Sequence, residues 1–170
     1  KAFERATGVE VIIDDSPDAQ VISRHALKHL GRRIVTADSG LEGLAVLDRL
    51  PVDLVVLDMH MPEMDGVETA TRIRQRSDTL NLPILALTGD GTPEGMRCAR
   101  AAGCDDVLIK PVGRQVLAQA AERLMAYGLP ALTHIGRDLE AAAGERDPAE
   151  AAALLARMDA VLHRASQVAP

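Results

Sequence analysis

The chain has 170 residues, of which 47% are hydrophobic, and a formal net charge of −6 at pH 7. This length allows one domain of ordinary size with a small appendage, and the negative charge argues against a non-specific nucleic-acid surface, which needs a basic stripe. With one Phe, one Tyr and no Trp, the core has to be built from aliphatic side chains.

Export and membrane insertion have no support in the sequence. No apolar run approaches the ~20 residues that a membrane span needs, and the N-terminus has no signal-peptide pattern. Cys98 and Cys104 are too few for a disulfide framework or a tetrahedral metal site. We therefore expect a cytoplasmic protein with reduced thiols and no direct membrane contact. A first residue of Lys1 rather than Met fits a piece of a longer chain.

The first part of the chain alternates predicted strands with predicted helices. Val9–Ile13 is an apolar, β-branched run that predicts a first strand and ends at Asp14-Asp15. Ser16-Pro17 supplies an N-cap and a first-turn proline for a helix that Gly31 would end. The spacing of this helix predicts that Ala19, Ile22, Ala26 and Leu30 face inward.

A second and a third strand–helix unit follow. Ile34–Ala37 predicts the second strand, and Ser39-Gly40-Leu41-Glu42 has capping-box spacing for a helix with Leu44, Leu47 and Leu50 inward. Leu54–Leu57 predicts a buried third strand that stops at Asp58, before a loop containing Pro62 and Gly66. The helix after it is predicted from about Val67 to Arg76, with Val67, Ala70 and Ile73 inward and Arg72, Arg74 and Arg76 outward.

Two further units complete the pattern. Ile84–Leu87 predicts a fourth strand ending on Thr88, and Thr92-Pro93 begins a helix that Gly103 closes. Val107–Ile109 predicts a fifth strand that ends on Lys110-Pro111. The last helix of this series is predicted from Val112 to about Tyr127, with an apolar side made of Val116, Leu117, Ala120 and Leu124.

Five strand–helix units in strict alternation indicate an α/β fold. Parallel strands need crossover helices, so the sheet should be parallel and covered on both faces, with right-handed crossovers. We predict a flavodoxin-like, doubly wound, five-stranded sheet in the order 2-1-3-4-5.

Chemistry-bearing side chains follow four of these strands. Asp14-Asp15, Asp58, Thr88 and Lys110 stand at the carboxyl ends of strands one, three, four and five, where such sheets bind ligands. Three converging carboxylates repel one another unless a cation lies among them, and oxygen ligands suit Mg²⁺. A lysine and a hydroxyl can hold phosphoryl oxygens, which makes Asp58 a candidate nucleophile for an aspartyl phosphate. Each signal alone is weak; together they point to phosphoryl transfer.

The stretch from about Val9 to Tyr127 resembles the receiver domain of two-component response regulators. The resemblance rests on four motifs in order: IIDDS at 12–16, LDMHMPEMDG at 57–66, LALTG at 85–89 and AAGCDDVLIKP at 101–111. It implies that Asp58 is the phosphoacceptor. It also implies a Mg²⁺ site with Asp15, Asp58 and the His60 backbone carbonyl as direct ligands and Asp14 acting through water.

The same resemblance implies that Thr88 and Lys110 contact the phosphoryl oxygens and that the Lys110-Pro111 bond is cis. One departure concerns the output, because Val107 occupies the strand position where such receivers usually carry Tyr or Phe. Valine has no comparable ring rotation. We therefore expect phosphorylation to move Thr88 and the signal to leave through the loop 89–93 and the helix beyond.

The sheet pattern ends near residue 128, which predicts a receiver domain over 1–128 and a C-terminal helical hairpin over 129–170. Two helices cannot enclose a core, so the apolar stripe of the hairpin should dock on the receiver or on a second copy, forming a homodimer. His134 and His163 lack the sequence context of phosphotransfer histidines, and we interpret them as surface residues.

The sequence therefore predicts a receiver that accepts a phosphoryl group from a histidine kinase or a histidine phosphotransfer protein and signals to a downstream protein. Both a stand-alone regulator and the receiver piece of a hybrid kinase fit. Self-phosphorylation and slow hydrolysis do not make it an enzyme in the usual sense. The alternative is a non-phosphorylated, receiver-like scaffold or dimerisation module that acts by protein–protein interaction. A metal-dependent phosphatase is disfavoured because His60 stands where its acid/base carboxylate would be.

Overall fold

The fold is a parallel sheet of five strands in the order β2-β1-β3-β4-β5. The computed structural model describes residues 8–127 and three single positions, 148, 152 and 155. The strands are β1 Val9–Ile13, β2 Arg33–Ala37, β3 Leu54–Asp58, β4 Ile84–Thr88 and β5 Asp106–Ile109. The predicted flavodoxin-like fold and strand order are confirmed. The hairpin expected over 129–170 lies outside the described residues, apart from those single positions.

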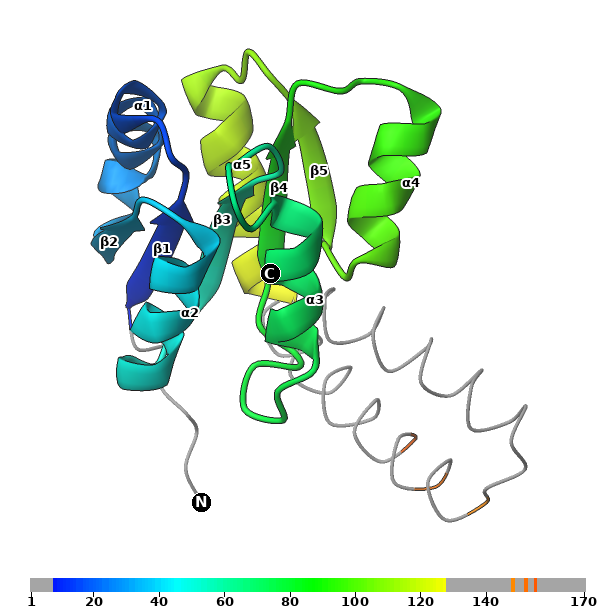
Figure 1. The fold of residues 1–170 in the computed structure, drawn as a ribbon. Coiled ribbons are helices and arrows are strands. Elements are labelled where there is room, and N and C mark those ends of the chain that lie inside the picture. The colour runs from blue at the N-terminus through cyan, green and yellow to red at the C-terminus, as the bar shows by residue number, and fades with distance from the viewer. Residues whose placement is uncertain (1–7, 128–147, 149–151, 153–154, 156–170) are drawn as a thin grey trace.

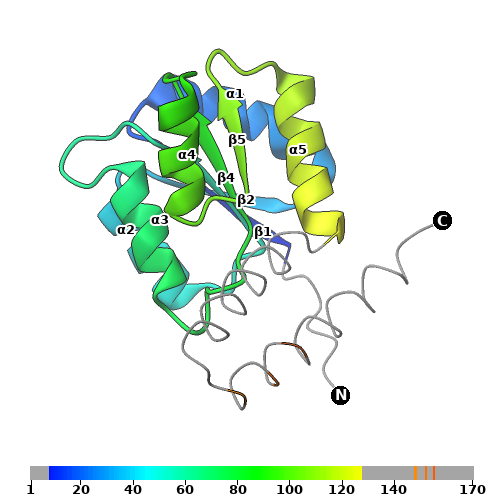
Figure 2. The ribbon, with the colours of Figure 1, turned by 90° about the vertical axis from the view of Figure 1, so that its right-hand side faces the viewer.

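Helices cover both faces of the sheet. They are α1 Pro17–Leu27, a short 3₁₀ helix Lys28–Leu30, α2 Gly40–Arg49, α3 Gly66–Arg74, α4 Pro93–Ala101 and α5 Arg114–Tyr127. In Figures 1 and 2, α2, α3 and α4 lie on one face and α1 and α5 on the other. Over the part of the chain that is described, none of these helices has the length and apolarity to span a bilayer.

Each face of the sheet has its own aliphatic core, because successive strand residues point to opposite faces. Val55 and Leu57 of β3 pack with Ala70 and Ile73 of α3 on one face. On the other face, Leu54 and Val56 pack with buried apolar residues of α1 and α5. All five residues of β1, β3 and β4 are buried. These three strands therefore form the buried centre of the fold.

The inward faces of three helices differ from the prediction. Ile22 of α1, Val67 of α3 and Val116 of α5 are 51%, 38% and 51% exposed, respectively. In α1 the buried residues are Ser23, Ala26 and Leu27. Both stripes have helical spacing and share Ala26, so periodicity alone could not choose between them, and only the contact with the sheet and α5 does.

Arg74 was predicted to face outward, and this is wrong. Its side chain is only 9% exposed, and its Nη2 lies 2.8 Å from Asp105 Oδ2. Its other nitrogens donate to the carbonyl oxygens of Gly103, Leu82 and Thr79, at 3.0, 2.6 and 3.2 Å. The guanidinium therefore joins the end of α3 to the loops that lead into β4 and β5.

We expect Arg74→Met to lower the free energy of unfolding by about 3–5 kcal/mol, because it leaves the buried Asp105 carboxylate without its cation. The control is Arg72→Met on the same helix, whose pair with Glu68 is about half exposed and should contribute about 0–1 kcal/mol. Urea unfolding of both variants measures the difference. Equal losses would contradict the structural role of Arg74.

A second buried charge lies in β1. Glu10 is fully buried, and neither carboxylate oxygen has a hydrogen-bond partner among the described residues. Its nearest cation is Arg32, with Nε 3.8 Å from Oε1, and Arg32 also pairs with Asp53 at 2.8 Å. Burial raises the pKa of Glu10 to about 7; Arg32 opposes this rise and Asp53 adds to it. The burial of Glu10 was not predicted, because a single charged residue in the otherwise apolar run Val9–Ile13 does not indicate whether its side chain faces the core.

The raised pKa makes stability depend on pH. Between pH 4.5, the usual pKa, and about 7, the folded state holds a proton that the unfolded state has lost, so stability falls as pH rises. A shift of this size corresponds to about 3 kcal/mol. We expect Glu10→Gln to remove this slope in urea unfolding followed across that pH range. Glu122→Gln on the exposed side of α5 is the control, and a Glu10→Gln curve parallel to wild type would refute the assignment.

Candidate functional site

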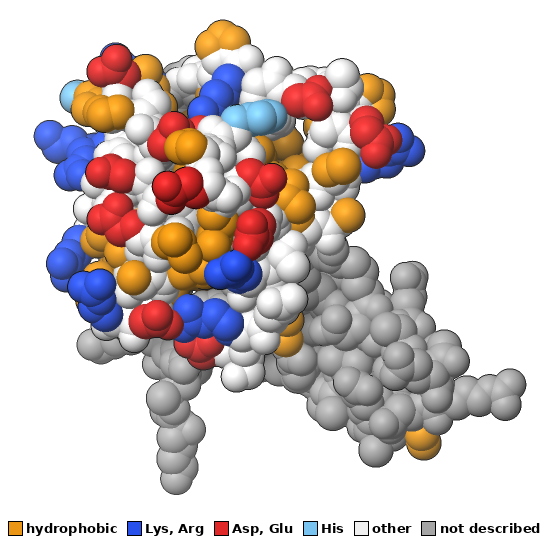
Figure 3. Space-filling model, in the orientation of Figure 1, with side chains coloured by type: hydrophobic (Ala, Val, Ile, Leu, Met, Phe, Trp, Pro, Cys, Tyr) orange, Lys and Arg blue, Asp and Glu red, His pale blue; other side chains and the backbone are white. Residues whose placement is uncertain are grey.

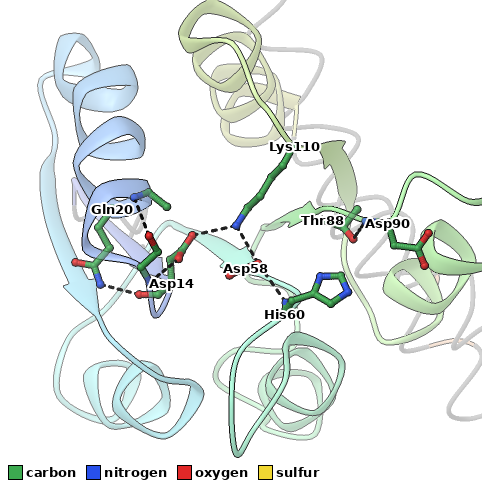
Figure 4. A network of polar contacts seen from close by, with 9 residues as sticks. Asp14, Gln20, Asp58, His60, Thr88, Asp90 and Lys110 are labelled. Atoms are coloured by element: carbon green, nitrogen blue, oxygen red, sulfur yellow. Dashed lines mark hydrogen bonds and ion pairs between the residues drawn. The ribbon is translucent and has the colours of Figure 1, made fainter.

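Strand register brings the predicted site residues to one edge of the sheet. Ile13 pairs with Leu57, so Asp14 and Asp58 come next to each other at the ends of β1 and β3. Thr88 pairs with Ile109, the last residue of β5, so Lys110 comes directly after the end of that strand. Figure 4 shows the Lys110 side chain reaching across from β5 toward the two aspartates.

Asp14 and Asp58 are both buried and share one lysine. The Nζ atom of Lys110 lies 3.1 Å from Asp58 Oδ1 and 3.4 Å from Asp14 Oδ2. Backbone N–H groups hold the same carboxylates: Ser16 donates to Asp14 Oδ1 at 2.9 Å, and His60 donates to Asp58 Oδ1 at 3.2 Å. These donors fix the carboxylates while part of their charge remains uncompensated.

Burial and the neighbouring charges together shift the pKa values of Asp14 and Lys110. Burial raises the pKa of Asp14, and the Asp58 charge adds to the rise, against the opposing effects of the Ser16 N–H and Lys110. Burial alone would lower the pKa of Lys110, but the hydrogen bond and the charges of Asp58 and Asp14 outweigh it and raise the pKa. Lys110 is therefore held in its charged form.

An exposed third carboxylate completes an acidic pocket. One oxygen of each of Asp14, Asp15 and Asp58 lies within 4.8 Å of the others. Lys110 contributes one positive charge to this group of three carboxylates. The oxygen-only donors and the remaining negative charge fit a hard divalent cation such as Mg²⁺ better than a transition metal that prefers nitrogen or sulfur. The backbone N–H of His60 donates to Asp58 Oδ1. The role of the His60 carbonyl as a metal ligand stays a prediction.

Comparison with known proteins identifies the family. The model of the response regulator receiver domain matches residues 11–122. This chain belongs to the response regulator receiver family. A probable cyclic di-GMP phosphodiesterase of Vibrio cholerae is 37% identical over 107 residues, which make up 63% of this chain and 24% of that protein. The CAI-1 autoinducer sensor kinase/phosphatase CqsS of the same organism is 32% identical over 109 residues, again 63% of this chain but 16% of that protein.

The fold likeness agrees with the family. A structure of the chemotaxis response regulator CheY4 of Vibrio cholerae has a TM-score of 0.65 and 30% sequence identity, covering 68% of this chain and 97% of that one. In the phosphodiesterase and in CqsS, by contrast, the segment similar to this chain makes up about a quarter or less of the whole protein. Receiver domains are signalling modules of two-component and phosphorelay systems, and the acidic pocket of this receiver is Asp14, Asp15 and Asp58.

Two further expectations concern the fifth strand of the receiver. The Lys110-Pro111 bond is cis, as the resemblance implied. Val107 is buried in the core that also contains Met59 and Met61. The position that usually carries an aromatic ring therefore holds a small side chain within the α3–α4 side of the core.

Thr88 is buried and already engaged. Its Oγ1 accepts a hydrogen bond from the Asp90 N–H at 3.0 Å, and Asp90 in turn accepts from the Thr92 N–H at 2.9 Å. Thr92 caps α4 by accepting from Gly95 N–H. A short chain of hydrogen bonds therefore connects the end of β4 to the first turn of α4; Figure 4 shows its first bond, between Thr88 and Asp90.

Gln20 of α1, which was not predicted as a site residue, supports the acidic pocket. Its Nε2 lies 2.7 Å from the Asp14 carbonyl oxygen and 2.7 Å from Asp38 Oδ1. It thus ties the loop after β1 to the loop after β2; Figure 4 shows the contact with Asp14. A glutamine on a helix carries no motif, so nothing in the sequence could have singled it out.

Gly66 allows α3 to begin directly against the end of β3. A Cβ atom on this residue would lie 2.5 Å from Met59 Cα and 2.6 Å from the Asp58 carbonyl oxygen. The Gly66 N–H also donates to the Met59 carbonyl at 3.1 Å. Because these neighbours are backbone atoms, they cannot move without moving the loop that carries Asp58.

We expect Gly66→Ala to lower the free energy of unfolding by about 1–3 kcal/mol, the usual range for overpacking. Gly89→Ala is the matched control, since nothing lies within 4 Å of a Cβ atom at that position, and it should stay within about 0.5 kcal/mol of wild type. Denaturant unfolding of the two variants makes the comparison. A Gly66→Ala protein as stable as the control would rule out the close approach.

Proposed function

We propose that this receiver accepts a phosphoryl group on Asp58, with Mg²⁺ held by Asp14, Asp15, Asp58 and the His60 carbonyl. The observation that carries the proposal is the buried Asp14–Asp58 pair bridged by Lys110, with Asp15 exposed beside it. A structural cap would not need three carboxylates and a lysine from three strands. The surplus negative charge and the inward lysine instead suit a cation and a phosphoryl group together.

The chemistry is a transfer between two side chains. An oxygen of the Asp58 carboxylate attacks the phosphorus of a phosphohistidine, forming an O–P bond as the P–N bond breaks. The donor imidazole, protonated on its other nitrogen, leaves neutral. Lys110 balances the charge of the incoming phosphoryl oxygens, and Thr88 can donate its hydroxyl to them. When bound, Mg²⁺ supplies further charge neutralisation at the same oxygens.

The phosphohistidine donor in this proposal is a histidine kinase or a histidine phosphotransfer protein. The sensor kinase/phosphatase CqsS contains a segment similar to this receiver, which supports such a donor. The recipient of the signal is a downstream protein. We place the event in the cytoplasm, in keeping with a receiver whose two cysteines are free. We also retain the division into a receiver over 1–128 and a helical extension over 129–170.

The response to phosphorylation is proposed to begin at Thr88. If its hydroxyl turns toward the phosphoryl group on Asp58, it gives up the Asp90 N–H that it now accepts. The loop 89–93 and the start of α4 then lose one of their restraints. Because Val107 has no aromatic ring that could move, we propose that the loop 89–93 and α4 carry the signal.

The decisive experiment is phosphorylation of the full chain with acetyl phosphate and Mg²⁺, followed by intact mass spectrometry. We expect the mass of one phosphoryl group on the wild type and none on Asp58→Asn, because only an ionised carboxylate at this position can attack. Chelation of Mg²⁺ with EDTA should abolish the reaction, and Asp15→Asn should demand more Mg²⁺ for the same yield.

Ser39→Ala, an N-cap at the start of α2 outside the acidic pocket, is the control and should be phosphorylated normally. A wild-type chain that gains no phosphate under these conditions would favour the unphosphorylated scaffold. Equal labelling of Asp58→Asn would place the acceptor elsewhere.

A further inference from the structure

A pocket lies between the α3 and α4 parts of the surface, next to the ends of β3 and β4. Its volume is about 400 Å³. Its lining comes from the loop after β3, the start of α3, the end of β4 and the first two turns of α4, namely Met59, His60, Met61, Asp65, Val67, Thr88, Asp90, Glu94, Gly95 and Cys98. Figure 3 shows hydrophobic side chains in a recess in this region, with acidic side chains next to it.

The base of the pocket is apolar and adaptable. Met59 and Met61 are 7% and 8% exposed, so they form its floor rather than its rim. Val67 and Cys98 are exposed walls on α3 and α4. Methionine side chains adjust to ligands of different shape, which suits a site that receives a bulky apolar side chain.

The rim of the pocket is acidic. Asp65, Asp90 and Glu94 line it, and the described lining includes no lysine or arginine. Arg97 lies one turn along α4 and pairs with Glu94, but both side chains are more than 70% exposed, so a partner cation can compete for the carboxylate. An apolar floor under three carboxylates favours a ligand that is apolar at its tip and positively charged at its sides.

A second copy of this chain is a poor occupant. The chain carries a net charge of −6, and two acidic surfaces repel each other as they approach. A basic segment of another protein is instead attracted to the rim.

We propose that this pocket binds a basic, amphipathic segment of the downstream protein, with a bulky aliphatic side chain on Met59 and Met61 and an adjacent Arg or Lys on Asp90 and Glu94. Thr88 lines this pocket and also belongs to the proposed transfer site, and its Oγ1 accepts a hydrogen bond from the Asp90 N–H. Movement of Thr88 toward Asp58 takes its side chain away from the pocket wall, so phosphorylation should tighten binding. This dependence on phosphorylation rests on the proposed function; the binding itself does not.

Cys98 provides a native reporter, because it is exposed and lines the pocket, whereas Cys104, the other cysteine of the chain, is buried. The probe is a short synthetic peptide that alternates Leu and Arg. Its controls alternate Leu and Glu, or Ser and Arg. The alkylation rate of Cys98 by a maleimide, followed by mass spectrometry on the full chain, reports occupancy. Backbone amide shifts from NMR report where each peptide binds.

We expect the Leu–Arg peptide to slow alkylation of Cys98 and to shift the amides of 59–61 and 88–95, while both control peptides leave them unchanged. Glu94→Gln should weaken binding about threefold, as the loss of one exposed ion pair does. Glu122→Gln, on α5 across the sheet, should have no effect. Shifts confined to other surfaces, equal binding of the Leu–Glu peptide, or self-association of the chain blocked by Glu94→Gln would each overturn the proposal.

The same titration on Asp58→Asn and on acetyl phosphate-treated wild type separates the two proposals. Binding to both proteins, tighter to the treated wild type, supports the pocket and its coupling. Binding without any phosphorylation of the wild type would overturn only the proposed function. Phosphorylation without protection of Cys98 would overturn only the pocket.

Discussion

The structure of this receiver depends on keeping two carboxylates, those of Asp14 and Asp58, buried side by side at the ends of adjacent parallel strands. Like charges in that position repel, and burial strengthens the repulsion because water no longer screens it. Lys110 offsets part of this from β5, and N–H groups of Ser16 and His60 offset more. What remains is a local excess of negative charge that a divalent cation can satisfy, which gives the proposed phosphoryl transfer its physical basis.

The scaffold holds this arrangement by close packing around short loops. Gly66 lets α3 start against the backbone of Asp58 and Met59, and Gln20 joins the loops after β1 and β2. Far from the site, Arg74 connects α3 with the segments that enter β4 and β5. The strands that carry Asp58, Thr88 and Lys110 are therefore held in register by contacts made at both ends of the sheet.

Val107 changes how such a receiver can report its state. The core on that side of the sheet is filled by methionine and other aliphatic side chains rather than by an aromatic ring, which agrees with a chain that has one Phe, one Tyr and no Trp. The same methionines form the floor of the α3–α4 pocket. Thr88 belongs to both this pocket and the proposed transfer site, so the two can communicate through one side chain and the short loop to α4.

The order of the elements, the parallel sheet and the residues at its edge could all be predicted from local patterns in the sequence. Alternating apolar runs and helix caps are local signals, and parallel strands necessarily bring Asp14, Asp58, Thr88 and Lys110 to one side. The tertiary structure alone decided which stripe of α1 faces inward, since Ala26 fits both. It also decided that Arg74 and Glu10 are buried, because the burial of a charge depends on partners distant in sequence, Asp105 and Arg32. The α3–α4 pocket likewise exists only where two separate stretches of the chain, 59–67 and 88–98, meet, and no local pattern encodes such a meeting.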